Sequence, residues 1–198
     1  MKIKKSKITQ VLILFNICYF LVQIILGGSE NINIIYHLGA LVPQEVVQGE
    51  SWRLITANFL HYGWLHLLVN MIALYFVGSF VDAKFGIYRY LLIYFISGIG
   101  AMAGFTYFAL KTNNTDYILL GASGAIMGLV GSITALFIQN FCKEKSLIAK
   151  NRLQFILFVV SIQFVCDLLM PEVSFYSHLF GFIIGFFVGS ILLIFTAQ

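Results

Sequence analysis

Two short segments of the sequence combine a reactive side chain with flanking glycines. Gly121-Ala122-Ser123-Gly124 offers a serine hydroxyl at the start of one apolar run, and Ser177-His178-Leu179-Phe180-Gly181 offers an imidazole at the start of another. A serine becomes an effective nucleophile when a base takes its proton, and neutral imidazole, with an unperturbed pKa of about 6.5, suits that task near neutral pH. The pair permits acyl transfer through a covalent serine intermediate, provided that the fold brings Ser123 and His178 together.

A second polar pair, His66 and Asn70, lies in another apolar run. Positions i and i+4 share one face of a helix, so the imidazole and the amide point the same way. Both can donate to the oxyanion that develops when a serine attacks a carbonyl, as can the free backbone N–H groups at the start of a helix that begins at Ser123. No acid is evidently placed to orient His178, so the pattern predicts a Ser–His dyad and no triad.

Competing hydrolytic chemistries have little support in the sequence. The sequence contains no His-Glu-x-x-His metal motif, and Asp167 has no second aspartate to pair with inside an apolar run. The three cysteines have no metal-ligand spacing. We therefore expect no metal and no cofactor.

The composition indicates that these polar groups lie in a membrane. Hydrophobic residues make up 60% of the 198 residues and charged residues only 10%, against about 45–50% and 25% in soluble domains. A spanning helix needs about 20 predominantly apolar residues, so the chain has material for about six spans. This excludes a soluble domain and a disordered chain. The expected spans are residues 8–26, 65–80, 87–110, 119–141, 153–170 and 174–195.

The basic residues predict the orientation of these spans. If the N-terminus is cytoplasmic, all of the 12 Lys and Arg residues except Arg53 and Lys111 lie in cytoplasmic segments. Both termini are then cytoplasmic, with a short tail over residues 1–7, and residues 27–64 form an extracytoplasmic loop. The net charge of +4 is therefore a topology signal, and we expect no nucleic-acid partner. We expect one domain over residues 1–198.

Small residues predict how two of the spans meet. At about 100° per residue, each of two spans carries a narrow stripe of small residues, which lets membrane helices approach backbone to backbone. One stripe contains His178, Gly181, Gly185 and Gly189, and the other contains Gly121, Gly124, Gly128, Gly131 and Ala135, with Ser123 at its edge. If the stripes face each other, Ser123 and His178 come within reach. The alternative is that the two stripes only pack the helices together and position no reactive groups.

Each polar group also has a structural interpretation when it is taken alone. A serine between glycines can be a packing site, and a membrane histidine can be a satisfied interhelical hydrogen bonder. The His66/Asn70 pair can join two helices, and Asp167 can be solvated near the interface or cap a neighbouring group. All of these groups lie toward the same, extracytoplasmic side, and a single site would require that arrangement.

At these residues the sequence resembles the rhomboid family of intramembrane serine proteases, from about Gly39 to Gly189. Two further segments belong to the match, Gly49-Glu50-Ser51-Trp52-Arg53 and Phe59-Leu60-His61. The resemblance implies an all-α membrane protein, a six-transmembrane-helix bundle of rhomboid type. In such a bundle the helix that carries Ser123 is central, and a water-filled cavity opens to the outside.

The resemblance also implies roles for individual residues. Ser123 is expected to be the nucleophile and His178 the general base. His66, Asn70 and the Ser123 backbone N–H are expected to form the oxyanion hole. Residues expected to support the site are Gly121, Gly124, Gly181, Met127, Trp52, Arg53, His61 and Asp167.

Four of these supporting residues have more specific expectations. Trp52 and Arg53 resemble a structural motif in the first loop, which lies half in the membrane. Asp167 aligns with an acid at the end of the fifth span, where substrate is thought to enter. We expect His61 to be a structural hydrogen bonder. Many members carry an aromatic residue where this chain has Met127, so we expect His178 to depend on His61, Ser177 or water for its orientation.

The predicted activity is cleavage of a peptide bond in or beside the transmembrane segment of single-span substrates in the lipid bilayer, through an acyl-enzyme. A bacterial plasma membrane is the expected location. One alternative is an inactive rhomboid relative that holds membrane clients, although such relatives typically lack the serine or the histidine. Another is a small transporter or channel, which predicts charged or broken helices at the bilayer midplane. The polar groups here lie toward one side.

Overall fold

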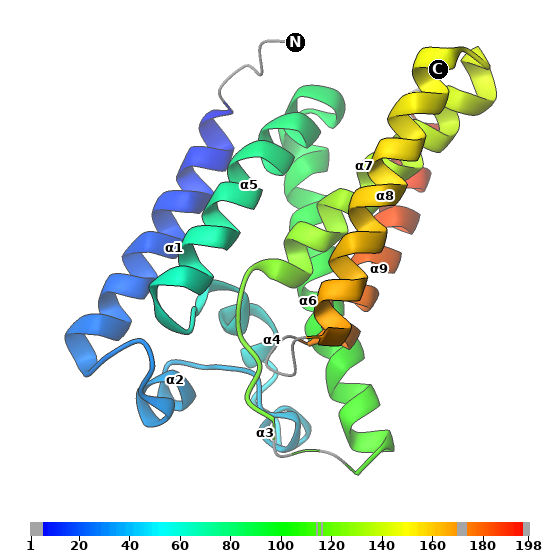
Figure 1. Cartoon of the computed structure of the whole chain (residues 1–198). Coiled ribbons are helices and arrows are strands. Elements are labelled where there is room, and N and C mark those ends of the chain that lie inside the picture. Colours follow the sequence, from blue (N-terminus) through cyan, green and yellow to red (C-terminus); the bar gives the residue numbers. More distant parts are fainter. Residues whose placement is uncertain (1–5, 114, 116, 170–173, 196–198) are drawn as a thin grey trace.

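Six long apolar helices run along the molecule in the computed structural model, which describes residues 6–113, 115, 117–169 and 174–195 (Figure 1). Each has 20 to 25 residues, enough to cross a bilayer at 1.5 Å per residue. They are α1 (Lys7–Leu26), α5 (Gly63–Phe85), α6 (Ile87–Lys111), α7 (Ser123–Glu144), α8 (Leu147–Leu169) and α9 (Phe175–Ile194). The predicted all-α, six-helix architecture is confirmed. Most of the predicted tail, and Met170 at the end of the predicted fifth span, lie outside the described residues.

The structure moves several predicted boundaries. Helix α5 extends beyond the predicted span at both ends, and α8 begins at Leu147, before the predicted start, because the polar residues Lys150, Asn151 and Arg152 are helical too. Helix α7 begins at Ser123, four residues later than predicted. Leu119 is instead extended and forms an isolated antiparallel bridge with Leu41. Gly121 then adopts φ +121°, which an L side chain rarely adopts and a helix cannot contain.

The segment between α1 and α5 folds against one end of the bundle (Figure 1). It contains only short helices: α2 (Ile32–His37), α3 (Pro43–Val47), α4 (Arg53–Thr56) and the 3₁₀ turn η1 (Ala57–Phe59). None of them is long enough to cross a membrane. As predicted, this loop does not add a span, and the bridge to Leu119 attaches it to the strand-like approach to α7.

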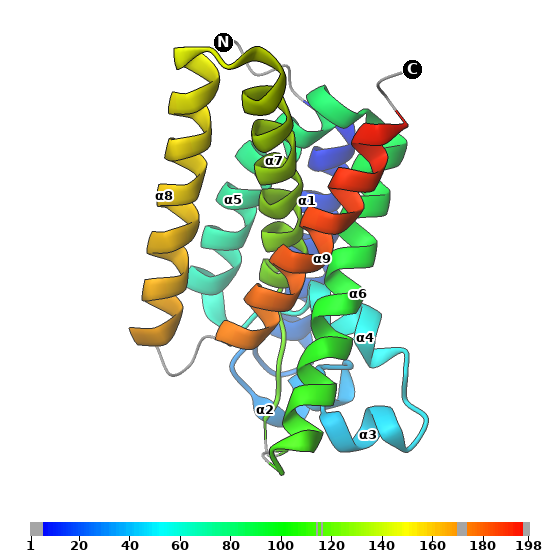
Figure 2. The same ribbon diagram turned by 90° about the vertical axis from the view of Figure 1, so that its right-hand side faces the viewer.

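Helix α7 is the central element of the bundle. It is the most buried of the six long helices and packs against α5, α6, α8 and α9 (Figure 2). All of its residues from Gly124 to Ala135 are buried. The helix predicted to carry the nucleophile is therefore surrounded by other helices from its second residue onward.

The two predicted stripes of small residues meet between α7 and α9. A Cβ atom added at Gly181 would overlap the carbonyl oxygen of Gly124, and one added at Gly185 would overlap the carbonyl oxygen of Gly128. The backbones of the two helices therefore touch, and only glycine fits at these points. This contact confirms the predicted seam and is the most extensive helix–helix contact of the bundle.

Polar residues of α1 connect it to its neighbours. Thr9 Oγ1 hydrogen-bonds to the hydroxyl of Tyr90 on α6 over 3.2 Å, and Gln23 exchanges two hydrogen bonds with the backbone of His61 over 3.0 and 3.1 Å. Asn16 donates to the Leu12 carbonyl of its own helix over 2.7 Å. A polar group in an apolar setting is costly without a partner, and these contacts provide partners for Thr9, Gln23 and the Asn16 N–H.

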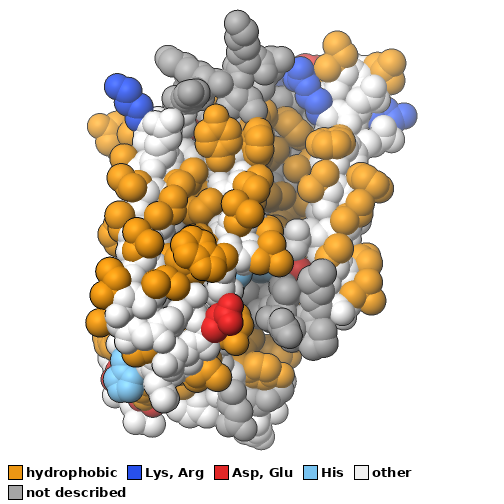
Figure 3. Space-filling model, turned by 60° about the vertical axis from the view of Figure 1, so that its left-hand side comes forward, with side chains coloured by type: hydrophobic (Ala, Val, Ile, Leu, Met, Phe, Trp, Pro, Cys, Tyr) orange, Lys and Arg blue, Asp and Glu red, His pale blue; other side chains and the backbone are white. Residues whose placement is uncertain are grey.

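Charge is distributed unequally along the bundle. Lys and Arg side chains gather at one end, while apolar side chains cover the flank (Figure 3). The start of α1, the α5–α6 turn and the α7–α8 turn lie at this end, and the end of α9 lies there too (Figures 1 and 2). The even number of long helices returns the chain to the side on which it started.

We expect Gly185→Ala to lower the unfolding temperature of the protein in detergent micelles. The new methyl group must push the α9 backbone away from Gly128, and overpacking of this kind costs about 1–3 kcal/mol. Gly100→Ala is the matched control, because a Cβ there meets only the end of the flexible Ile184 side chain. Equal unfolding temperatures for the two variants would contradict backbone contact at Gly185.

Candidate active site

Ser123 is the first residue of α7 and lies at the end of a tightly held turn. The backbone N–H of Gly121 donates to the Ala57 carbonyl over 2.8 Å, which attaches this turn to η1. Ser123 is partly exposed, whereas Ala122 and Gly124 on either side are buried. The hydroxyl therefore stands at a helix start with free backbone N–H groups beside it.

His178 lies in the first turn of α9. The side chain of Ser174 caps this helix by accepting from the Ser177 N–H over 3.2 Å. One turn further along, Gly181 rests on the backbone of Gly124, the residue after Ser123. The glycine contact therefore brings the histidine turn of α9 to the serine end of α7. No hydrogen bond joins the two side chains in this part of the structure, and in unliganded sites such bonds are often long.

The structure corrects the expectation that no acid orients His178. The Oδ2 atom of Asp167, in the last turn of α8, lies 2.7 Å from Nδ1 of His178. The two side chains are only 1% and 7% exposed, so Asp167 is not solvated, and it pairs with a neighbouring group, the ring of His178. Spacing could not predict this contact, because the two residues belong to different helices.

In the part of the chain that the structure describes, neither of the two residues expected to orient His178, His61 and Ser177, makes a hydrogen bond to its ring. The hydroxyl of Ser177 donates to the Ser174 carbonyl over 3.1 Å, within its own helix turn. The ring of His61 packs edge-on against His66, with 5.1 Å between ring centres, and not against His178. Met127 is buried on α7 one turn after Ser123. The hydrogen bond that Nδ1 of His178 makes to Asp167 is the polar contact that the structure gives the imidazole.

This contact determines which nitrogen of His178 can act as a base. A carboxylate accepts hydrogen bonds, so the proton of the neutral ring lies on Nδ1, between His178 and Asp167. The lone pair of Nε2 is then available. A base with that tautomer can take the proton of a serine hydroxyl.

His66 is oriented by its own helix start. The backbone N–H of Tyr62 donates to His66 Nδ1 over 3.3 Å, so the proton of the neutral ring lies on Nε2. The Nε2 atom is 2.8 Å, and Ser123 Oγ 3.8 Å, from the point where a Cβ of Gly121 would stand. His66 Nε2–H and Ser123 therefore face the same small volume, and only a glycine at position 121 leaves that volume open.

Asn70 lies on the same face of α5 as His66, as predicted. Its side-chain amide donates to the carbonyl oxygen of His66 over 2.9 Å, and it is buried. One N–H of the amide is used in this bond, and a second N–H remains.

Arg53 ties the first loop together. Its guanidinium is buried and donates to the carbonyl oxygens of Tyr36 and Ala40, both over 2.8 Å, and to Glu50 over 2.6 Å. The guanidinium also lies over the ring of Trp52, 4.9 Å from its centre. These bonds join α2, the turn after it and α4. The geometry agrees with a structural motif in this loop.

The Trp52 ring packs where the loop turns at Gly39. A Cβ added at Gly39 would overlap that ring, and Gly39 has φ +95°. The hydroxyl of Thr56 donates to the Gly39 carbonyl over 2.7 Å. Trp52 is nevertheless 45% exposed, so part of the ring remains free for the membrane interface.

His61 lies between η1 and α5 and is fully buried. Its backbone is held by Gln23, as described above, whereas its ring stands against His66. Burial, assisted by the neighbouring His66, lowers the pKa of His61 to about 3. The ring is therefore neutral at physiological pH. The hydrogen bonds predicted for His61 are made by its backbone.

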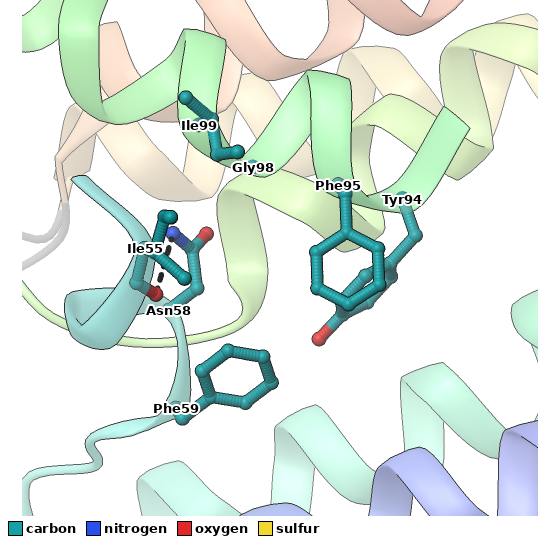
Figure 4. A pocket seen from close by; sticks show the side chains of 7 residues that line it. All are labelled: Ile55, Asn58, Phe59, Tyr94, Phe95, Gly98 and Ile99. Carbon is teal, nitrogen blue, oxygen red and sulfur yellow. Dashed lines mark hydrogen bonds between the residues drawn. The ribbon is translucent and has the colours of Figure 1, made fainter. Parts of the chain in front are cut away.

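Two cavities lie away from these residues. A small one of about 10 Å³ lies between η1 and α6, where the Tyr94 hydroxyl points toward the Phe59 ring and the Asn58 amide lies against Ile55 and Gly98 (Figure 4). A larger groove of about 660 Å³ lies between α5, α7 and α8, in the half of the bundle away from Ser123. It is lined mainly by apolar side chains, and neither cavity contains a predicted catalytic residue.

Residues that the sequence analysis missed help to hold the site. Gln163 donates from Nε2 to Asp167 Oδ1 over 2.8 Å, one helical turn away. Its i, i+4 spacing from an acid in an apolar run could have predicted this hydrogen bond. Tyr36 and Glu50 were missed as partners of Arg53, because loop contacts leave no periodic pattern.

The site combines a serine at a helix start, a histidine with a free Nε2 and a second histidine that presents an N–H, all in a six-helix membrane bundle. The family model described as the Rhomboid domain matches residues 48–195. The chain belongs to the rhomboid family, and it is an integral, multi-pass membrane protein.

Several curated proteins are similar to this chain. "RHOMBOID-like protein 6, mitochondrial" of Arabidopsis thaliana is 40% identical over 79% of this chain and 48% of its own length. "Rhomboid protease GluP" of Bacillus subtilis is 33% identical over 95% of this chain and 35% of its own length. "Inactive RHOMBOID-like protein 8" of Arabidopsis thaliana is 34% identical over 74% of this chain and 40% of its own length. The chain thus spans less than half the length of these relatives.

We expect acid to destabilise the fold through His61. The unfolded chain binds a proton as the pH falls below the ordinary histidine pKa of about 6.5, whereas folded His61 stays neutral down to about pH 3. Stability from this residue is therefore complete above pH 6.5 and lost between pH 6.5 and 3. At pH 5 the loss is about 2 kcal/mol.

The measurement is the unfolding temperature in detergent at pH 7 and pH 5. His61→Phe, which keeps a buried ring without a titrating group, should show a smaller drop than wild type. His37→Gln is the control, because His37 is exposed and its ring bonds only within its own helix. An equal drop in His61→Phe and wild type would show that other groups cause the acid sensitivity.

Proposed function

We propose that this chain is an intramembrane serine endopeptidase, with Ser123 as nucleophile and His178 as general base. The observation that carries the proposal is the glycine contact of α9 on the start of α7, which joins the histidine turn to the serine turn. The contact of His178 Nδ1 with Asp167 leaves Nε2 as the proton acceptor. The relative GluP is named a protease, which supports the same activity.

The proposed reaction proceeds in two halves. His178 Nε2 takes the proton of Ser123 Oγ as the oxygen bonds to the carbonyl carbon of the substrate peptide. The C–N bond breaks, and the leaving amine takes the proton from His178, which leaves an acyl-enzyme ester on Ser123. Water then gives a proton to His178 and attacks the ester. The new carboxyl group leaves as Ser123 regains its proton.

The oxyanion of each half-reaction needs donors on the side opposite the base. His66 Nε2–H faces the volume beside Gly121 and Ser123, and the backbone N–H of Ser123 lies at the helix start. The second N–H of Asn70 is a further donor, one turn along α5 from His66. We infer that these groups form the oxyanion hole.

The groove between α5, α7 and α8 supports a membrane-protein substrate. Its lining includes Phe80 from α5, Phe137 from α7 and Phe155 from α8. A single-span substrate with its scissile bond at Ser123 would extend from there toward the opposite face of the bilayer. The groove lies in that direction from Ser123. Its helix must unwind at the scissile bond, because helical peptide groups are bonded internally.

We further propose that the serine end of the bundle faces the extracytoplasmic side. Apart from Arg53 and Lys111, the Lys and Arg residues that the structure describes belong to segments at the opposite end, and such residues favour the cytoplasm. Both termini are then cytoplasmic. The chain is proposed to act in a bacterial plasma membrane, with its first loop partly embedded in the outer leaflet.

The decisive test is cleavage of a single-span model substrate by the whole chain in liposomes. Wild type should cleave it and should react at Ser123 with a fluorophosphonate probe. Ser123→Ala and His178→Ala should lose about 10³-fold or more of the cleavage rate, because each removes a group that reacts with the substrate. Ser132→Ala is the control, since its hydroxyl bonds only to Leu129 on the same helix.

Cleavage that survives Ser123→Ala would overturn the mechanism. Wild-type protein that neither cleaves a panel of substrates nor reacts with the probe would favour a client-binding function. The similarity to an inactive relative keeps that function as the second candidate.

His66→Ala tests the oxyanion hole separately. We expect kcat to fall by about 10²–10³-fold with little change in KM, because the lost donor acts on the transition state. Probe labelling of Ser123 should persist at a reduced rate. Trp64→Phe on the same helix is a control at an exposed position. Unchanged kcat in His66→Ala would remove His66 from the proposed hole.

A further inference from the structure

We propose that Asp167 is a positioning residue for His178, so that the chain works with a Ser–His–Asp arrangement. This inference rests on the proposed function. It starts from the 2.7 Å contact between Asp167 Oδ2 and His178 Nδ1, which joins the last turn of α8 to the first turn of α9. Both side chains are almost completely buried.

Asp167 is itself held in a fixed orientation. Its second oxygen, Oδ1, accepts a hydrogen bond from Gln163 over 2.8 Å. One oxygen is therefore used by α8 and the other is directed at the imidazole. A buried carboxylate is costly without such partners, and this one has two.

The pairing gives His178 two properties that a base needs. The carboxylate keeps the proton on Nδ1, so Nε2 is the nitrogen that lacks one. When Nε2 takes the serine proton, the ring becomes a cation, and the adjacent negative charge stabilises it. Asp167 does this without touching substrate.

The surroundings of His178 offer few other ways to fix the ring. Within the described part of the chain, His178 forms no ring pair of the kind that joins His61 to His66, and the residue one turn after Ser123 is the flexible Met127. Ser177 bonds within its own turn, to the carbonyl of Ser174. A hydrogen-bonded carboxylate takes the place of a stacked ring.

A purely structural role makes a different prediction. Helix α8 is the least buried of the six long helices, so Asp167 could serve only to attach α8 to α9. Loss of that tie would lower the unfolding temperature. It would leave kcat unchanged well below that temperature, and the tautomer of His178 would not change.

The test compares Asp167→Asn, Asp167→Glu and the control Asp82→Asn, which makes the same change at the far end of α5. Steady-state cleavage of the single-span substrate is measured well below each unfolding temperature. Asp167→Asn should lose about 10²-fold or more in kcat with KM within about twofold, because an amide cannot stabilise the cation and can donate to Nδ1. Asp167→Glu should restore at least part of kcat, and Asp82→Asn should match wild type.

The ¹⁵N NMR spectrum of histidine-labelled protein gives an independent signature. In wild type, the His178 signals, assigned by their loss in His178→Gln, should show a proton on Nδ1 and an unprotonated Nε2. Asp167→Asn should remove that pattern. Wild-type kcat in Asp167→Asn, or an unchanged tautomer, would overturn the role of Asp167 while leaving the protease intact. Wild-type protein without cleavage or probe labelling would overturn the proposed function and this inference together.

Discussion

The contact between the backbones of α7 and α9 is the constraint on which the site depends. In lipid, apolar side chains gain little by leaving their surroundings, so helices associate through close van der Waals packing and interhelical hydrogen bonds. Gly124 and Gly128 on α7 meet Gly181 and Gly185 on α9 without an intervening side chain. That approach sets the distance between the first turns of the two helices, where Ser123 and His178 lie. A single Cβ in this seam would separate the two side chains as well as the helices.

The polar groups at this end of the bundle are supported by the structure immediately around them. His66 is oriented by the Tyr62 N–H, His178 by Asp167, and the turn before Ser123 by the Ala57 carbonyl. Burial in an apolar medium makes each unpaired group costly, so these bonds restrict the rings to single tautomers. The first loop contributes through Arg53, whose bonds within the loop hold the segment that carries Ala57.

Much of this arrangement was predictable from periodicity and spacing. Six apolar runs predicted six spans, and small residues at helical spacing predicted the α7–α9 seam. The start of α7 was predicted four residues too early, because hydropathy cannot distinguish an extended apolar segment at Leu119 from a helix. The loop contacts of Arg53 could not be predicted for a related reason. They join positions that no helical or strand periodicity relates.

The missed Asp167–His178 contact has a more specific cause. A lone acid in an apolar run has one evident partner in its own helix pattern, Gln163, whereas His178 lies on another helix, and helical periodicity does not relate the two helices. Asp167 lies on α8, which has the smallest buried fraction of the six long helices and forms one wall of the apolar groove. Displacement of α8 to widen the groove would therefore separate a buried carboxylate from the histidine, and breaking such a pair is costly. The hydrogen bond that orients His178 also limits how far the helix beside the groove can move.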